Sequence, residues 1–283
     1  MNTPGIAQRG VALIAVLWLV AAMGLIITGI VQSVRSEART VGLQRQAVVA
    51  NALADGAILL ALQNMHAQQK EPSNAVQVIP VQFEGQTSEV SVQPLNGLID
   101  INNATPQLLA EMYRHAGGLN EQAAQALAQA TVELRQLTSE KGTTQGFDAT
   151  EDLLRVPKMT YNLYAKINGL ITADLKDGSG RVNALAAPLG VLEVLTSGNV
   201  ARAAILATKR NADSNVMDTS FLKPEHIEMT SSRSLQLQVQ VSLPGGDSSQ
   251  KTWLVSWGTD RRSGLPWRVL GTRQSIQHAA QPK

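Results

Sequence analysis

The chain has 283 residues, of which 44% are hydrophobic and 16% are charged. The low charged fraction argues against disorder as the main state. Because there is no cysteine, a disulfide-stapled fold, a zinc ribbon and a thiol catalyst are excluded. The net charge of +2 is too small to indicate a nucleic-acid binder. Residues 100–199 hold 8 basic and 11 acidic residues, whereas residues 200–283 hold 11 basic and 6 acidic, which indicates segments with different surroundings.

The N-terminal segment contains a long apolar run. No charged residue occurs between Arg9 and Arg35. As a helix, the run Gly10–Val34 would be ~37 Å long, which exceeds the ~30 Å of a bilayer's hydrocarbon core. The run is too long for the apolar part of a secretory signal, and no small-x-small cleavage site follows it. We therefore expect a membrane helix over residues 11–34. The count of flanking basic residues does not decide its orientation, because a long domain follows.

The residues before this run resemble a processing signal. The start MNTPGIAQRG is short and polar, and the apolar run begins abruptly at Val11. Residues 1–10 resemble the leader of type IV pilin-like proteins, which prepilin peptidase cuts on the cytoplasmic side of the span. The cut would fall between Gly10 and Val11, so the mature protein would keep the span.

The fifth position after this cut departs from the usual pilin pattern. Most pilins and pseudopilins carry a glutamate there, and this chain has Ala15. A carboxylate inside a membrane span is costly unless it is paired. In pilin-like fibres its usual partner is thought to be the N-terminal amine of the neighbouring subunit. A subunit without the glutamate has lost one assembly contact, which suits the tip of a fibre.

The stretch RGVALIAVLWLVA, without that glutamate, closely resembles the K-type minor pseudopilins of type II secretion systems (the general secretion pathway protein K family). The resemblance extends over nearly the whole chain. It implies a structural, non-enzymatic subunit at the pseudopilus tip, with the C-terminal domain in the periplasm and the N-terminus in the cytoplasm. The implied partners are the I- and J-type minor pseudopilins, the major pseudopilin, prepilin peptidase and the assembly platform of the inner membrane.

Two other functions remain open. The first alternative is a tip minor pilin of a type IV or DNA-uptake pilus. Salt-sensitive DNA binding by residues 70–283 would support it. The other is a membrane-anchored enzyme. The sequence contains no nucleophile-elbow, Walker or dinucleotide-binding motif, and the four histidines have no metal-ligand spacing. We therefore expect no catalysis and no nucleic-acid partner.

Periodicity predicts an α+β fold in the rest of the chain. The helix of the span continues to about Gln68 and packs an amphipathic face on a sheet. Strands are predicted at 76–83, 87–93, 235–243, 251–257 and 266–272, with a turn at 244–247. Pro80 places the first of these strands at an edge of the sheet. Helices are predicted at 106–116, 119–137, 150–173, 186–196 and 199–210.

This order predicts a pilin-like α/β domain with an antiparallel sheet, interrupted by an all-helical insertion that is SAM-like or helix-hairpin-helix-like. The long helix and first strands occupy residues 35–102, the insertion residues 103–225, and the last strands residues 226–283.

One internal repeat stands out. The segment Gly97–Leu109 aligns without gaps to Gly180–Leu192, and each copy has a glycine, a short strand and a helix start near a proline. In the K-type family both copies resemble G-x-I-N-x-N-T-A-P. The first copy keeps Asn102 but has Asp100 in place of the other asparagine, and the second keeps Asn183. We expect two strand-to-helix entries, in which asparagine bonds to nearby backbone and caps the following helix, rather than a binding site.

The segment Leu153–Thr160 resembles the hairpin of a helix-hairpin-helix unit. In such hairpins glycine lets backbone amides approach a DNA phosphate. Here Lys158 and Thr160 replace both glycines. A helical packing corner is therefore the better interpretation.

Three carboxylates, Asp148, Glu151 and Asp152, follow a loop that contains glycine. They could hold calcium together with backbone carbonyls, and members of the resembled family bind calcium in the helical domain. A capping box explains them better, with Asp148 as N-cap and Glu151 as the third helical residue.

The last strands are basic. Their four arginines form either a solvated face or a contact with an acidic partner; these are Arg261, Arg262, Arg268 and Arg273.

Overall fold

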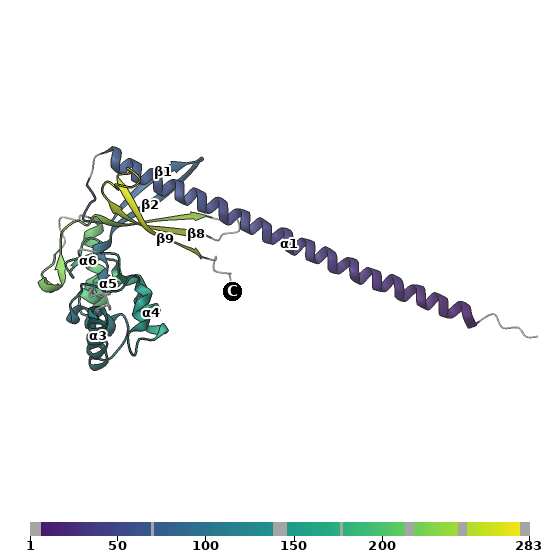
Figure 1. Ribbon diagram of the computed structural model, residues 1–283, viewed down its shortest axis with the longest axis horizontal. Helices are drawn as coiled ribbons and strands as arrows, with labels where there is room; N and C mark the ends of the chain where they lie inside the picture. Colours follow the sequence, from purple (N-terminus) through teal and green to yellow (C-terminus); the bar gives the residue numbers. More distant parts are fainter. Residues whose placement is uncertain are drawn as a thin grey trace, which may run out of the picture.

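The computed structural model describes residues 7–68, 71–137, 146–175, 178–212, 218–242 and 248–277. It confirms the predicted α+β class. A long N-terminal helix lies against a five-stranded antiparallel sheet, and a helical unit lies beside the end of that helix farthest from the N-terminus (Figure 1).

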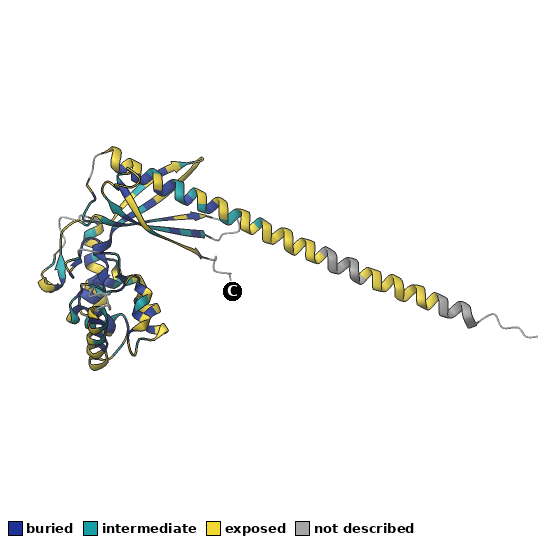
Figure 2. Cartoon of the chain, in the orientation of Figure 1, coloured by how far each residue is buried: buried dark blue, intermediate teal, exposed yellow. Residues whose placement is uncertain are grey.

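Helix α1 (Ala7–Ala67) is continuous over 61 residues and ends one residue before the predicted end. Its two halves differ in burial (Figure 2). The described side chains before Gly42 are exposed, whereas the half that follows Val49 packs on the sheet. The buried face consists largely of small and aliphatic side chains, namely Ala50, Ala54, Ala57, Ile58, Ala61, Leu62 and Met65. Small residues bring the helix close to the sheet: a Cβ on Gly56 would overlap the ring of Phe83.

The sheet has the order β1-β2-β7-β8-β9, and every neighbouring pair is antiparallel. Its strands are β1 (Gln77–Phe83), β2 (Gln86–Pro94), β7 (Ser234–Ser242), β8 (Ser248–Trp257) and β9 (Trp267–Gln277). The alternation that predicted β7 has a direct cause, because its leucines and valines are buried under α1 and its glutamines lie on the other face. Pro80 lies on the edge strand β1, as predicted. The predicted turn at 244–247 lies outside the described residues.

The helical unit is inserted between β2 and β7. Its helices are α2 (Pro106–His115), α3 (Glu121–Gln136), α4 (Tyr161–Ile167), α5 (Leu189–Leu195) and α6 (Val200–Ala212). The prediction of one helix over 150–173 is wrong. That stretch holds the 3-10 turn Thr150–Arg155, α4, a second 3-10 turn and a short strand. Pro157 separates the first turn from α4, since the residue before a proline is biased away from the helical conformation.

Two short parallel ladders lie in this unit. Strand β3 (Ile99–Asp100) pairs with β4 (Ile171–Thr172), and β5 (Val182–Asn183) pairs with β6 (Ile227–Glu228). Strands β3 and β5 confirm the short strand predicted in each repeat copy. Their partners β4 and β6 were not predicted, because strands of two residues have no periodicity. Because β3 and β6 belong to these ladders, the inserted unit extends beyond 103–225 at both ends.

The two repeat copies lie against each other in a reciprocal way. A Cβ on Gly97 would overlap the backbone carbonyl of Ala186, and a Cβ on Gly180 would overlap that of Asn103. Gly97 and Gly180 are equivalent in the alignment of the copies, and so are Asn103 and Ala186. The copies are therefore related by a pseudo-twofold arrangement. Each glycine is required by the close approach of the other copy.

Buried residues form separate cores in the two halves. One core lies between α1 and the sheet, and a larger one fills the helical unit. A small cluster connects them and consists of Leu95, Leu98, Leu175 and Leu254.

Candidate functional site

The predicted cleavage junction lies at the start of α1. Gly10 and Val11 are within the helix, and their side chains are outside the described set. Ala15 is exposed, in a stretch from Leu13 to Gly24 where every side chain is exposed. Large apolar side chains are almost fully uncovered there, with Leu13 at 74% and Trp18 at 73% of their accessible surface. Exposed apolar surface of this extent indicates a non-aqueous environment or a partner.

The apolar character of α1 suffices for a membrane crossing. By length and composition, the described stretch Gln32–Ala67 passes that test, but 39% of its most apolar window is buried within the protein. Such burial is typical of a core helix. Leu13–Gly24 is a shorter apolar stretch inside the charge-free run Gly10–Val34, and it is exposed on all sides. The charge-free run therefore has the character of a membrane span, in agreement with the predicted single anchor.

Between this run and the sheet, α1 carries a stripe of valines. Val34, Val41 and Val48 are 59%, 58% and 68% exposed. Their spacing of seven residues places them on nearly the same side of the helix. We call these three residues the valine stripe. Val34 is the last residue of the charge-free run, whereas Val41 and Val48 lie beyond it. All three are exposed, so the stripe is available to another helix.

The acidic segment 148–152 is arranged as a cap, shifted from the predicted one. Oδ2 of Asp152 accepts hydrogen bonds from the backbone N–H groups of Asp148 (3.0 Å) and Ala149 (3.1 Å). Asp148 as N-cap with Glu151 as third residue is therefore wrong: Ala149 is the N-cap of the 3-10 turn and Asp152 is its third residue. Among the described residues, no group of three or more His, Asp or Glu side chains is placed to hold a metal ion. Calcium stays a prediction.

The hairpin-like segment Leu153–Thr160 forms a corner between the 3-10 turn and α4. Lys158 has a φ of 72°, in the left-handed region that glycine favours. Oγ1 of Thr160 accepts a hydrogen bond from the N–H of Leu163 and caps α4. The element keeps the backbone shape that a glycine would favour at 158, but the side chains serve packing and capping.

The repeat motifs lead from strand to helix, as predicted, but the prediction that their asparagines cap the helices is wrong. Thr105 caps α2. Oδ1 of Asp100 accepts from the N–H of Asn102, and Oδ1 of Asn183 accepts from the N–H of Leu185. Both copies thus contain the same side-chain-to-backbone turn two residues long.

The asparagine amides hold separate segments together. Asn102 donates to the carbonyls of Phe147 (2.9 Å) and Ala173 (3.2 Å), and its Oδ1 accepts from the N–H of Phe147. Asn183, which is fully buried, donates to the carbonyls of Asn74 (2.6 Å) and Thr230 (3.1 Å). These bonds join the repeats to distant loops, and they support the structural rather than the binding interpretation.

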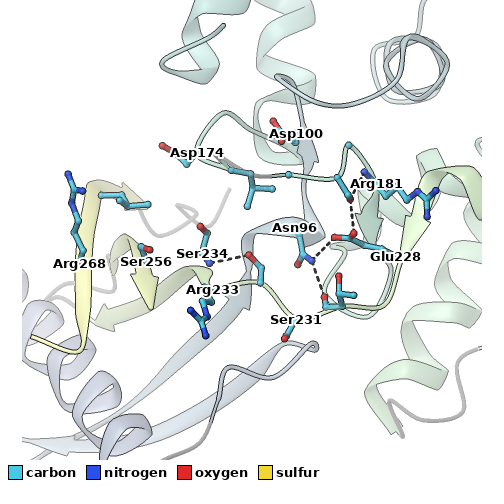
Figure 3. A pocket seen from close by; sticks show the side chains of 17 residues that line it. Asn96, Asp100, Asp174, Arg181, Glu228, Ser231, Arg233, Ser234, Ser256 and Arg268 are labelled. Carbon is cyan, nitrogen blue, oxygen red and sulfur yellow. Dashed lines mark hydrogen bonds between the residues drawn. The ribbon is translucent and has the colours of Figure 1, made fainter. Parts of the chain in front are cut away.

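A cavity of about 460 Å³ lies where the sheet meets the helical unit (Figure 3). Nδ2 of Asn96 donates to Oε1 of Glu228 (2.8 Å), whose Oε2 accepts from Oγ of Ser179 (2.6 Å). Arg181, Arg233 and Arg268 line the wall, and Figure 3 shows that their guanidinium groups do not converge on a common point. Both carboxylate oxygens of Glu228 already accept hydrogen bonds from residues at the junction. The cavity is therefore better explained as a gap between the sheet and the helical unit than as a ligand site.

Two carboxyl groups beside this cavity have altered acidity. Burial raises the pKa of Asp100, although hydrogen bonds from Asn103 and from the backbone of Asn102 oppose the shift. Burial also raises the pKa of Asp174, against the charge of Arg273. Desolvation disfavours the ionised form in both cases.

Sequence reasoning missed one ionic cluster in the helical unit. Glu111 accepts hydrogen bonds from His115 and from Lys223, each at 2.8 Å. Together the two contacts lower the pKa of Glu111 below its ordinary value, against the effect of burial. The spacing of Glu111 and His115 on one helix could have indicated their contact. Lys223, which is 112 residues away, carried no such signal.

These observations define a class: an α+β protein whose single apolar N-terminal helix continues into the core of a sheet, with a helical unit inserted between the strands. No protein-family model matches the chain, and no curated protein matches it. Among solved structures, it is similar to a chain in the crystal structure of the GspK-GspI-GspJ complex from the type 2 secretion system of enterotoxigenic Escherichia coli. The identity is 15%, the TM-score is 0.44, and the match covers 85% of this chain and 98% of that one.

Proposed function

We propose that the protein is a minor pseudopilin at the tip of a type II secretion pseudopilus, where it has a structural role in starting assembly. The observation that carries this proposal is the continuity of α1. One helix contains a charge-free run that begins directly after Arg9, and the same helix ends in the core of the sheet domain. A cleaved secretory signal would not be continuous with the core in this way.

The proposed membrane arrangement follows from this helix. Prepilin peptidase would cut between Gly10 and Val11, and the charge-free run would hold the subunit in the inner membrane. The sheet and the helical unit would then lie in the periplasm. After extraction from the membrane, the same run would pack among the helices of neighbouring subunits.

Contacts with the neighbours would use the valine stripe. Val41 and Val48 are more than half exposed beyond the predicted span, and they gain free energy when a second helix covers them. We assign this surface to the helices of the I- and J-type minor pseudopilins. The absence of a carboxylate at Ala15 removes the contact with a subunit above, and the helical unit adds bulk beside the membrane-distal end of α1 (Figure 1). Both features suit a position with no subunit above it.

The first test is the N-terminal sequence of the membrane-extracted protein, expressed with and without prepilin peptidase. A start at Val11 that depends on the peptidase is the expected result. An intact Met1 in both samples would contradict the pilin-like class and leave a plain signal-anchored protein.

A second test separates the pseudopilus from other fibres. Val41→Asp and Val48→Asp should abolish co-purification with I- and J-type subunits and leave the fold intact. Leu43→Asp is a matched control, because Leu43 is 58% exposed but lies off the stripe. Equal loss with the control would exclude the stripe as the interface. Salt-sensitive DNA binding by the unmodified protein would favour a DNA-uptake pilus instead.

A further inference from the structure

The two edges of the sheet have opposite character. Edge strand β1 contains Pro80, which cannot donate a backbone hydrogen bond, and its hairpin with β2 carries exposed Glu84 and Glu89. Edge strand β9 has 11 residues without proline or any acidic residue. In the part of the chain that the structure describes, no strand pairs with its outer side. Its outward N–H and C=O groups are thus open to a further strand.

The β8–β9 hairpin is basic. Four arginines are exposed along β9 and the turn that precedes it, namely Arg261, Arg262, Arg268 and Arg273. Among the described residues, none of them has a carboxylate partner within the 4.0 Å of an ion pair. The one acidic side chain of this hairpin within the described residues, Asp260, accepts hydrogen bonds from Ser263 and from the N–H of Arg262 in its own turn. Asp260 lies near enough to Arg268, and Asp174 near enough to Arg273, to interact through charge without forming an ion pair. The four arginines outnumber these two carboxylates, so the hairpin keeps an excess of positive charge.

A bulge gives this edge its geometry. Arg268 is opposite Ser256 and Arg273 is opposite Thr252, although the two arginines are five residues apart, because the register shifts between Leu254 and Val255. Residues four apart on β8 lie on one face, so both arginines lie on the same face of the sheet. Beyond the bulge, the segment Gly271–Gln277 is regular. Beside Arg268, a cavity of about 640 Å³ lies between the strand and the helical unit, and Asp148 and Asp174 line it as well.

We propose that the outer edge of β9 binds an extended acidic segment of a partner protein by strand addition. The partner strand would pair with Gly271–Gln277 and place an acidic side chain opposite Arg273, where opposite charges on facing residues are favourable. Its continuation would pass Arg268 and the turn arginines. The acidic β1–β2 hairpin of a second copy has the right charge, but Pro80 interrupts its hydrogen bonding, so a different protein is the favoured partner. This inference does not depend on the proposed function.

The test uses the full chain in detergent micelles and a fluorescein-labelled peptide, acetyl-(Glu-Thr)4-amide, with acetyl-(Lys-Thr)4-amide as its matched control. Fluorescence anisotropy should show binding of the glutamate peptide alone. Arg273→Glu should weaken it roughly five- to tenfold, because an attraction becomes a repulsion. The control is Arg39→Glu on α1, where the arginine is exposed and forms no ion pair with a described residue. This change should leave the affinity unchanged.

Backbone pairing is tested with two N-methylated forms of the glutamate peptide, one methylated at every Glu and the other at every Thr. A strand offers alternate N–H groups to its two sides. Strand addition therefore requires one form to lose binding and the other to keep it. Equal binding of both forms would mean simple electrostatic adhesion and would overturn the proposal. Three other results would also overturn the proposal. They are absence of binding, tighter binding of a single-stranded oligonucleotide than of the peptide, and self-association of the protein that the peptide does not displace.

Discussion

The sheet half and the helical unit have separate cores, and they are assembled from the chain in different ways. The core under the sheet joins α1 and β1–β2 to strands that follow more than 130 residues later, from Ser234 onward. The core of the helical unit draws on one contiguous stretch between Ile99 and Ile227. Local contacts form without closing long loops. The helical unit can therefore fold before the sheet is complete, whereas the sheet requires the end of the chain.

Paired core substitutions test this separation most strongly. Leu109→Ala in the helical unit and Ile58→Ala in α1 each remove a fully buried side chain and should each cost about 2–5 kcal/mol of unfolding free energy. Hydrogen exchange followed by mass spectrometry should show lost protection in the substituted half alone. Val41→Ala, at an exposed position, should change stability by less than about 0.5 kcal/mol. Equal loss of protection in both halves would show a single cooperative core.

The junction between the halves should be sensitive to Asn183→Ala. This change leaves the carbonyls of Asn74 and Thr230 without their buried donor and should cost about 2 kcal/mol. Because Asn74 precedes the sheet and Asn183 lies in the helical unit, we expect reduced protection on both sides of the seam. Gln125→Ala, on the exposed side of α3, is the control. A loss confined to the helical unit would show that Asn183 does not couple the halves.

Each half also contains a residue whose backbone is strained. Lys158 in the helical unit has a φ of 72° and Glu84 in the β1–β2 turn has a φ of 48°. Glycine adopts these conformations without the ~1 kcal/mol that other residues incur. Lys158→Gly should therefore stabilise the helical unit, and Glu84→Gly the sheet half, each by about 1 kcal/mol. Chemical denaturation monitored by hydrogen exchange would assign each gain to its half. A gain in the wrong half would contradict the separation.

Acid should weaken the helical unit through His226. This side chain is 4% exposed, and its Nδ1 has no hydrogen-bond partner among the residues that the structure describes. Burial lowers the pKa of this imidazole below 6.5, although Glu225 and Glu111 oppose the effect and Lys223 adds to it. The unfolded chain then binds more protons than the folded one as pH falls through 6.5, so stability is lost in that window. His226→Gln should remove the part of the loss in unfolding free energy between pH 7 and pH 5 that is due to this histidine. The measurement is the difference in unfolding free energy between the substituted and unsubstituted proteins at each pH. An identical pH profile for both would refute this role.

Much of this architecture was predictable, and the reasons are local. The alternation in Leu235–Val241 fixed β7 and its buried face, and Pro80 indicated an edge strand. The long helix followed from an apolar pattern uninterrupted by proline. Helices α2 and α3 were predicted near their observed bounds. Their caps, Thr105 and Asn120, were not predicted.

What could not be predicted depends on distant partners. The repeat indicated the short strands β3 and β5, but their pairing with β4 and β6 depends on residues about 45 to 70 positions away. The roles of the asparagines depended on loops far along the chain: Asn183 bonds to Asn74, 109 residues away. The 150–173 stretch misled because its Leu-rich composition favours a helix, whereas Pro157 and the tight corner at Lys158 divide it. That β9 is an edge strand with an unpaired outer side among the described residues could be recognised only from the strand order of the sheet. No local sequence pattern contains this order.

Helix α1 also has a mechanical consequence. Its 61 residues form a rod ~90 Å long, with no proline between the exposed half and the half that fills the sheet core. A pull applied at the N-terminal end therefore reaches the alanine-rich contact around Ala54 and Ile58 as a shearing load, shared among many side chains at once. A hinge between the two halves would instead let the helix swing away and peel its contacts apart one by one. The unbroken helix makes the domain follow its anchor as a rigid body.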